Sequence, residues 1–280
     1  MHRFLRSLFG RVGLKNSALL TKFYQFFVSI HFKNRFGKIL HFRGANFIVG
    51  KDLSLYPSIS SGDFESKELD IVLAQNFQPG SILWDVGANV GIWSILLAKE
   101  YSSCKVVSFE PQKEAHQFLQ RNIANNHLTN IEVMGIGLGA TRERVELRTP
   151  KEKCGSSSIV LSHKKENDKV DIIDIVTADS ILEDRPDLVP SFMKIDIEGY
   201  EPRMISGAHN LIADKQPIIM LEVFPKLWSQ TFISEWEATL EFLMKVYSGG
   251  MICDANVVSK FSSLNFSKLG SRQRNIFFGL

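Results

Sequence analysis

A short segment in the first half of the chain combines an acid with two glycines at a spacing that suits ligand binding. Residues 82–86 are apolar on both faces, which predicts a buried strand in the middle of a parallel sheet. The strand breaks into a turn that contains Gly87 and Gly91, where the absence of a Cβ lets the backbone turn tightly and approach a ligand. Asp85 stands at the strand end, which is where open α/β sheets bind their ligands.

A second acid follows at a matching distance. Residues 105–109 predict another short apolar strand, and Glu110 comes directly after it. An acid at the tip of the second strand, about 20 residues after a glycine turn, can accept hydrogen bonds from both hydroxyls of a ribose. The two segments together therefore predict an adenosine-containing cofactor.

The glycine spacing excludes two common nucleotide sites. A dinucleotide fingerprint needs Gly-x-Gly-x-x-Gly, but Asn89 and Ile92 occupy its second and third glycine positions. A phosphate-binding P-loop needs Gly-Lys-Ser/Thr, which this chain lacks at the turn. The remaining pattern, Asp-x-Gly-x-Asn-x-Gly, resembles motif I of the class I S-adenosylmethionine-dependent methyltransferases. The resemblance implies that S-adenosylmethionine is the cofactor.

Further ionisable residues follow two later predicted strands. Asp196 and Glu222 end strands four and five, and Glu198 lies just before a helix expected from Glu201. An alcohol acceptor needs a base that takes its proton, and each of these three acids is a candidate. Glu198 fits equally well as a cap of the following helix. Lys194 is a catalytic candidate as well, although pairing with one of the acids also explains it.

Alternating strands and helices predict the fold class. We expect an α/β protein with a doubly wound, Rossmann-like, mostly parallel sheet and helices on both faces. A basic helical extension and a small hairpin at 39–49 would precede it, with residues 1–60 as the extension and 61–280 as the methyltransferase domain. The other expected elements are helices at 65–77, 113–127, 201–213 and 236–246, and strands at 131–136, 144–148, 170–176, 192–197, 217–223, 251–254 and 275–278.

Charge is distributed unevenly along the chain. The first 51 residues hold ten Lys or Arg and no acid, which leaves 23 basic against 30 acidic residues in the remainder. Residues 18–33 carry an apolar stripe at helical spacing, too short and interrupted to span a bilayer. Such a helix either packs on the domain or lies in a membrane interface, and a transit peptide is a third option. Three scattered cysteines favour a reducing compartment, so we expect a cytoplasmic protein, with residues 1–45 as the segment for peripheral membrane contact.

The chain resembles the FkbM family of methyltransferases over residues 64–279. The matching stretches are Trp-Asp-Val-Gly-Ala-Asn-Val-Gly from Trp84, Phe-Glu-Pro from Phe109, and Lys-Ile-Asp-Ile-Glu-Gly-Tyr-Glu from Lys194. The resemblance implies methyl transfer, usually to a hydroxyl of a sugar, glycolipid or other natural product. Gly137 would let the adenine lie against the backbone. The expected cofactor-binding residues are Asp85, Gly87, Ala88, Asn89, Gly91, Glu110, Pro111, Gly137 and Asp196.

Other functions remain open at this level. The chain could be a non-catalytic S-adenosylmethionine-binding protein at a membrane surface, or an RNA-directed methyltransferase that uses its basic arm. The acidic remainder makes nucleic acid the less favoured partner. No Asn/Asp-Pro-Pro turn follows strand four, which argues against methylation of nucleobase amino groups. The residues after strand five do not form the Asp-Asn pair of metal-dependent methyltransferases, so we expect no metal.

Overall fold

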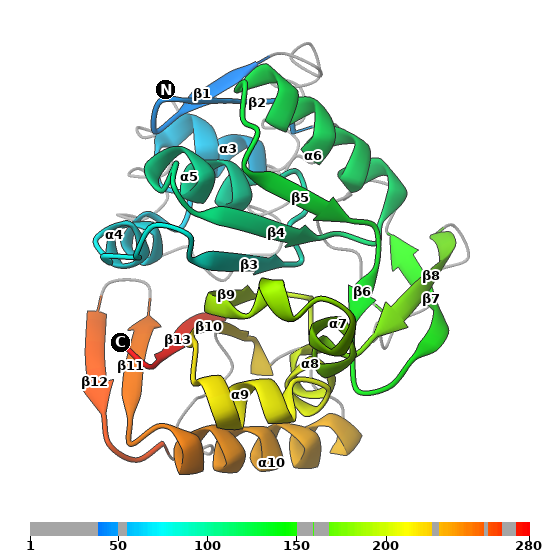
Figure 1. Cartoon of the computed structure of the whole chain (residues 1–280), viewed down its shortest axis with the longest axis vertical. Coiled ribbons are helices and arrows are strands. Elements are labelled where there is room, and N and C mark those ends of the chain that lie inside the picture. Colours follow the sequence, from blue (N-terminus) through cyan, green and yellow to red (C-terminus); the bar gives the residue numbers. More distant parts are fainter. Residues whose placement is uncertain are drawn as a thin grey trace, which may run out of the picture.

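A central sheet of eight strands organises the described part of the chain (Figure 1). The computed structural model describes residues 39–49, 55–149, 159, 168–225, 230–254, 257–264 and 273–280. The strand order in the sheet is β12-β11-β13-β10-β9-β3-β4-β5. Its parallel strands are β3 (Ile82–Val86), β4 (Lys105–Phe109), β5 (Ile131–Met134), β9 (Pro190–Ile195) and β10 (Ile218–Val223). The strands joined by antiparallel pairing are β11 (Gly250–Asp254), β12 (Val257–Phe261) and β13 (Arg274–Phe278).

The order of the parallel strands confirms the doubly wound topology. From β3 the chain runs outward through β4 to β5, and it later returns to place β9 and then β10 on the other side of β3. The winding direction therefore reverses between β3 and β9. Connections that leave in opposite directions open a crevice at the carboxyl ends of such neighbouring strands.

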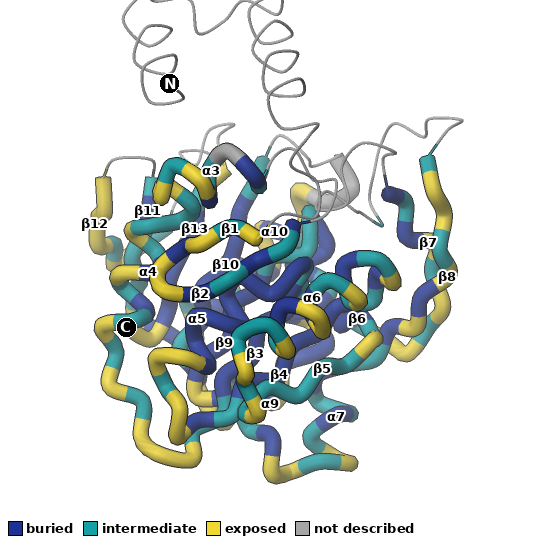
Figure 2. The backbone as a smooth tube through the Cα atoms, turned by 90° about the horizontal axis from the view of Figure 1, so that it is seen from above, coloured by how far each residue is buried: buried dark blue, intermediate teal, exposed yellow. Residues whose placement is uncertain are grey.

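Helices cover both faces of the sheet, as the sequence predicts. Adjacent residues of β3 point to opposite faces, so that Leu83 and Trp84 belong to different hydrophobic clusters. The helices on the face of Leu83 are α3 (Leu55–Ser61), α4 (Ser66–Leu73), α5 (Ile92–Glu100) and α6 (Lys113–Asn125). Those on the face of Trp84 are α7 (Ala178–Asp184), α8 (Glu201–Ser206), α9 (His209–Lys215) and α10 (Gln230–Val246). The central strands are buried between these layers, and exposed residues gather on the periphery (Figure 2).

The predicted hairpin is present and belongs to the main core. Its strands β1 (Leu40–Phe42) and β2 (Ala45–Phe47) pair antiparallel, and Phe47 packs with residues of β3 and α5. Asn122 of α6 is fully buried; its Oδ1 accepts from the Ile48 N–H at 2.8 Å, and its Nδ2 donates to the Val90 carbonyl at 2.8 Å. The hairpin and α3 thus share one hydrophobic cluster with the domain, and the expected boundary at residue 60 stays a prediction.

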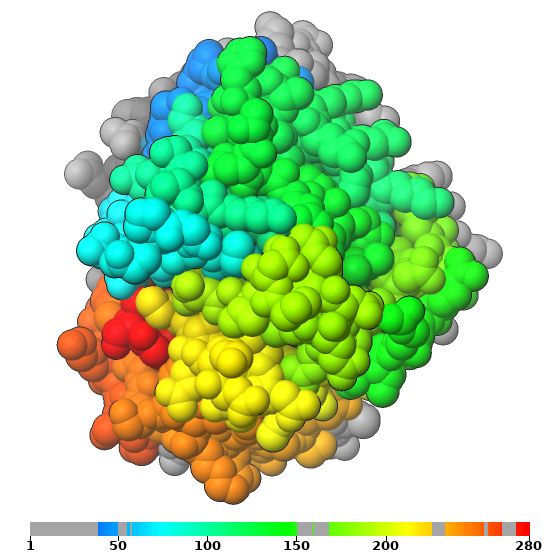
Figure 3. Space-filling model, viewed as in Figure 1, coloured from blue at the N-terminus to red at the C-terminus, as the bar shows by residue number. Residues whose placement is uncertain are grey.

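Two further features lie at the edges of the molecule. The strands β6 (Gly137–Leu138), β7 (Glu143–Thr149) and β8 (Lys169–Val176) form a separate sheet in the order β6-β8-β7, on the side opposite the β11–β12 hairpin (Figure 1). The C-terminal residues that follow β13 reach the surface (red in Figure 3), whereas β13 itself is largely buried. Asn275 Nδ2 of β13 donates to Glu68 Oε1 of α4 at 3.2 Å. This hydrogen bond joins α4 and β13, which are far apart in the sequence.

Several expected elements differ in the structure. The helix expected at 201–213 is divided into α8 and α9 at Gly207, where an added Cβ would lie 1.9 Å from the Gly139 carbonyl oxygen. The helix expected to reach residue 77 ends at Leu73, and α3, α7, the 3-10 turn at Pro186–Leu188 and β12 were not predicted. The amphipathic helix expected at 18–33 falls outside the described residues. No helix within the described ranges is long and apolar enough to cross a membrane.

Candidate active site

A cavity of about 570 Å³ opens at the carboxyl ends of β3, β4, β9 and β10. Its volume lies in the range of small-molecule sites, and it coincides with the point where the winding direction reverses. The cavity has two chemically different ends. The apolar end is lined by Pro111, Leu138, Leu147, Ile159, Ile173 and Ile175. The charged end is lined by Glu65, Lys194, Asp196, Glu198 and Glu222.

The glycine turn after β3 forms one wall of the cavity. The N–H groups of Gly87 and Ala88 both donate to the Phe109 carbonyl at 3.0 Å, which ties the turn to β4. Gly87 has a φ of +79°, and a Cβ there would lie 1.9 Å from the carbonyl oxygen of Asp196. Asn89 has a φ of 51°, a left-handed conformation that Asn adopts more readily than most residues. This explains why Asn is accepted where the motif often has glycine.

Gly91 and Gly137 have packing roles that are visible in the structure. Gly91 has a φ of +89° and lies behind the cavity lining, where a Cβ would come within 2.3 Å of Leu119 Cδ1. Gly137 does line the cavity, and a Cβ there would lie 2.5 Å from Ile175 Cδ1. Contact of Gly137 with an adenine ring stays a prediction.

Asp85 supports the turn from beneath and is not part of the cavity lining. It is fully buried, and its Oδ2 accepts from Ser94 Oγ at 2.5 Å at the start of α5. Burial raises the pKa of Asp85, and the ammonium of Lys194, 3.6 Å from its Oδ1, opposes that shift. Its carboxylate also accepts a hydrogen bond from the Ser94 backbone within α5. Because the Asp85 side chain is fully buried behind the cavity wall, it does not contact the cavity directly.

Glu110 lies in the cavity wall, and its carboxylate can accept more hydrogen bonds than the two it already accepts. Its Oε2 accepts from the Asn89 N–H at 2.7 Å and its Oε1 from the Gln112 N–H at 2.8 Å. A carboxylate has about four acceptor positions, so both oxygens can still accept from a ribose diol. Burial raises the pKa of Glu110 to about 7, and the two N–H donors only partly offset this. Within the described chain, the neighbouring buried Asn89 Oδ1 has no hydrogen-bond partner, which also suits a polar ligand.

Lys194 forms the predicted ion pair at the charged end. Its Nζ lies 3.0 Å from Asp196 Oδ2 and donates to the Gly87 carbonyl at 3.2 Å. Burial lowers the pKa of Lys194, but the carboxylates of Asp196, Asp85 and Glu65 outweigh that effect and raise the pKa. The side chain therefore stays a cation that holds the strand end of β9 against the turn after β3.

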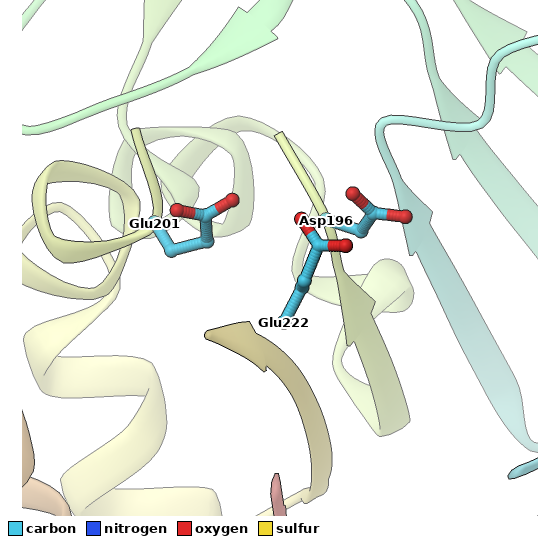
Figure 4. Close-up of side chains that lie close together, drawn as sticks. All are labelled: Asp196, Glu201 and Glu222. Carbon is cyan, nitrogen blue, oxygen red and sulfur yellow. The ribbon is translucent and has the colours of Figure 1, made fainter. Parts of the chain in front are cut away.

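Three carboxylates meet where β9, α8 and β10 come together (Figure 4). One oxygen from each of Asp196, Glu201 and Glu222 lies within 4.8 Å of the other two. Burial, followed by repulsion from Asp196 and Glu201, raises the pKa of Glu222 well above its usual value. Gln273 Nε2 donates to Glu222 Oε1 and orients it. Three such carboxylates can bind a divalent cation in principle, so the expectation that no metal binds stays a prediction.

Glu198 lies in the turn between β9 and α8, where its conformation and its neighbours can be described. Glu198 has a φ of 54° and lines the cavity. The N-cap of α8 is Tyr200, whose side chain makes no capping hydrogen bond. Within the turn, the carboxylate of Glu201 accepts the N–H groups of Ile197 at 2.9 Å and Gly199 at 3.1 Å, and a cap by Glu198 stays a prediction. Sequence reasoning missed Glu201 as a member of the cluster, although it belongs to the same Lys-Ile-Asp-x-Glu-Gly-x-Glu block. Glu65 and Gln273 also line the cavity without any signal in their local sequence.

Known methyltransferases resemble parts of this chain. Methyltransferase sdnD of Sordaria araneosa is 26% identical over 160 residues, which is 47% of this chain and 62% of that protein. Methyltransferase 1 of Beauveria bassiana is 22% identical over 180 residues, covering 56% of this chain and 72% of the relative. The crystal structure of methyltransferase FkbM from Methylobacillus flagellatus matches with a TM-score of 0.45 and 20% identity, over 73% of this chain and 45% of that one. The chain thus spans less than two thirds of the first of these relatives.

A family model identifies the domain that contains the site. The model of the methyltransferase FkbM domain matches residues 85–247, which is more than half of the chain. That range includes the glycine turn, Glu110 and all three members of the carboxylate cluster. The family implies S-adenosylmethionine as the cofactor, and a cavity with an apolar end, a carboxylate that can still accept hydrogen bonds and an anionic end fits its adenosine and its cationic methionine half. The chain belongs to the FkbM family of S-adenosylmethionine-dependent methyltransferases.

Proposed function

We propose that this methyltransferase methylates a hydroxyl oxygen of a sugar, glycolipid or other small-molecule acceptor. The observation that carries the proposal is the carboxylate cluster at the charged end of the cavity, with Glu222 at its centre. S-adenosylmethionine supplies an electrophilic methyl group on a sulfonium. An alcohol that attacks it must lose its proton, and a carboxylate is the group that accepts one.

Glu222 is the residue that we assign as the general base. It is buried in the cavity wall at 6% exposure, and burial with the neighbouring carboxylates raises its pKa, so that its ionised form takes up a proton more readily than an ordinary glutamate. Gln273 fixes one of its oxygens. The neighbouring Asp196 is held by Lys194, so that these two residues orient the acceptor and set the local charge.

The positions of the apolar and charged ends of the cavity support the assignment of Glu222 as the general base. The apolar wall near Pro111 suits the flat adenine ring of the cofactor. The adjacent residue Glu110 offers a carboxylate that can accept hydrogen bonds from the ribose. The reacting end of the cofactor would then lie toward Gly87 and Asp196, which both line the same cavity. Glu222 shares this end, within hydrogen-bonding reach of Asp196. An acceptor hydroxyl placed there meets both the base and the methyl group.

The experiment is a methyl-transfer assay with radiolabelled S-adenosylmethionine and a panel of glycosides, glycolipids and simple polyols. With an acceptor found, Glu222→Gln should lower kcat about 100-fold or more, because loss of a general base typically costs that much. Binding of S-adenosylhomocysteine should change little. Glu237→Gln, at an exposed position of α10, is the matched control and should keep full activity. Transfer only to amines, or full kcat in Glu222→Gln, would contradict the proposal.

A further inference from the structure

Glu65 reaches the cavity from outside the region that the family model matches. It stands immediately before α4, 20 residues before the first matched position, Asp85. Its side chain lines the cavity, and Trp93 Nε1 donates to Glu65 Oε2 at 2.5 Å. Trp93 is 2% exposed and lies in the first turn of α5, so this hydrogen bond attaches Glu65 to the helix that follows the glycine turn.

The backbone at Glu65 is held in an uncommon conformation. Its φ and ψ are 37° and 39°, in the left-handed region, which a residue other than glycine adopts at a cost in free energy. Its carbonyl accepts from the Leu69 N–H at 2.9 Å, and Leu69 is fully buried in the core. The packing of α4 therefore maintains a backbone turn that directs Glu65 toward the site.

Near Glu65, the carboxylates outnumber the ammonium group that interacts with them, so that an additional cation would be stabilised there. Glu65, Asp85 and Asp196 all interact with the single ammonium of Lys194. Burial and then repulsion from Asp196 raise the pKa of Glu65 to about 7. Within the described ranges, no hydrogen-bond donor reaches Glu65 Oε1. A second positive charge in this end of the cavity would stabilise the ionised form of Glu65.

The geometry of the cavity determines which part of the cofactor lies there. The cofactor's adenine, ribose and methionine follow one another in a line. If the adenine occupies the apolar wall and Glu110 binds the ribose, the methionine half lies toward the end of the cavity that Glu65 and Asp196 line. We propose that Glu65 binds the α-ammonium group of the cofactor's methionine half, so that residues before the family match complete the cofactor site. The inference rests on the assignment of this cavity to S-adenosylmethionine.

The test is a cycle of two ligands and two proteins, measured by isothermal titration calorimetry. The ligands are S-adenosylhomocysteine and its deaminated analogue, in which hydrogen replaces the ammonium. The proteins are the wild type and Glu65→Gln, which keeps an oxygen to accept from Trp93. A charged hydrogen bond corresponds to about 10- to 100-fold in affinity. We expect the wild type to bind S-adenosylhomocysteine that much more tightly than the analogue, and Glu65→Gln to bind the two about equally.

Two control variants separate this role from a structural one. Glu110→Gln should weaken both ligands alike, because each ligand carries the ribose. Glu68→Gln on the same helix contacts Asn275 instead of the cavity and should change neither affinity. An equal loss of both ligands in Glu65→Gln, or a wild type that does not distinguish them, would overturn the inference. If the wild type binds neither ligand, the cofactor assignment itself fails, and this inference fails with it.

Discussion

Replacing Gly87 by alanine tests whether the turn after β3 has to pass close to the end of β9. Gly87 has a φ of +79°, and an added Cβ would lie 1.9 Å from the Asp196 carbonyl oxygen and 3.0 Å from its carbonyl carbon. Gly80 is a natural control, since its φ is +85° and nothing lies within 4 Å of its added Cβ. The two substitutions therefore share the backbone strain and differ in the clash.

The expected costs follow from these two effects. Left-handed strain destabilises an L-residue by about 1–2 kcal/mol, and both variants should show it. Overpacking adds typically about 1–3 kcal/mol, because a backbone carbonyl cannot move aside as a flexible side chain can. We expect Gly80→Ala to lower the free energy of unfolding by about 1–2 kcal/mol and Gly87→Ala by about 3 kcal/mol or more.

Urea unfolding of the wild type and both variants, followed by circular dichroism, gives these free energies directly. A parallel titration with S-adenosylhomocysteine should show binding to Gly80→Ala and strongly reduced binding to Gly87→Ala, because the turn has to move away from Asp196. Equal destabilisation of the two variants, with binding intact in both, would show that the close approach of Gly87 to Asp196 is not needed.

Three further predictions concern pH, metal and membrane. Burial raises the pKa of Glu201 from 4.5 to about 7, so the folded state keeps a proton that the unfolded state releases, and stability should fall by up to roughly 3 kcal/mol as pH rises through that window. Glu201→Gln should make this decline shallower in thermal melts at pH 5 to 8, because Glu65 and Glu110, whose pKa values are also raised to about 7, keep their share of it; an unchanged slope would contradict the reasoning. Because Lys194 already neutralises Asp196, EDTA should leave methyl transfer unchanged, whereas recovery on adding Mg²⁺ after a loss would reveal a metal. A chain shortened to begin at residue 39 should still bind S-adenosylhomocysteine but no longer sediment with anionic liposomes, and unchanged sedimentation would remove the membrane hypothesis.

The sheet and its strand-end residues could be predicted because their signals are local. An apolar run followed by Asp85 and Gly87 specifies a buried strand and a tight turn within a few residues. The same holds for β4 with Glu110 and for β9 with Asp196. Since parallel strands end at one edge, their carboxyl ends had to converge, and the structure places Glu110, Asp196 and Glu222 in one cavity.

The remaining site features depend on packing that no local pattern reports. Glu65 enters the cavity through a left-handed turn maintained by Leu69, and Gln273 enters through the pairing of β13 with β10. Asp85 was expected near the cofactor because strand ends usually face ligands, yet its side chain turns inward to Ser94. The division between α8 and α9 lies where Gly207 approaches the distant Gly139, a contact that helical periodicity does not contain.

The most direct test of the central claim is the thermal stability of the wild type and Glu110→Ala, each with and without S-adenosylhomocysteine. Ligand at about 100 times its dissociation constant should add about 2.7 kcal/mol to the free energy of unfolding. We expect a clear rise in Tm for the wild type and little or none for Glu110→Ala, if that carboxylate in the cavity wall accepts the ribose hydroxyls as predicted. An equal rise in both proteins, or none in the wild type, would contradict the placement of the cofactor at this edge of the sheet.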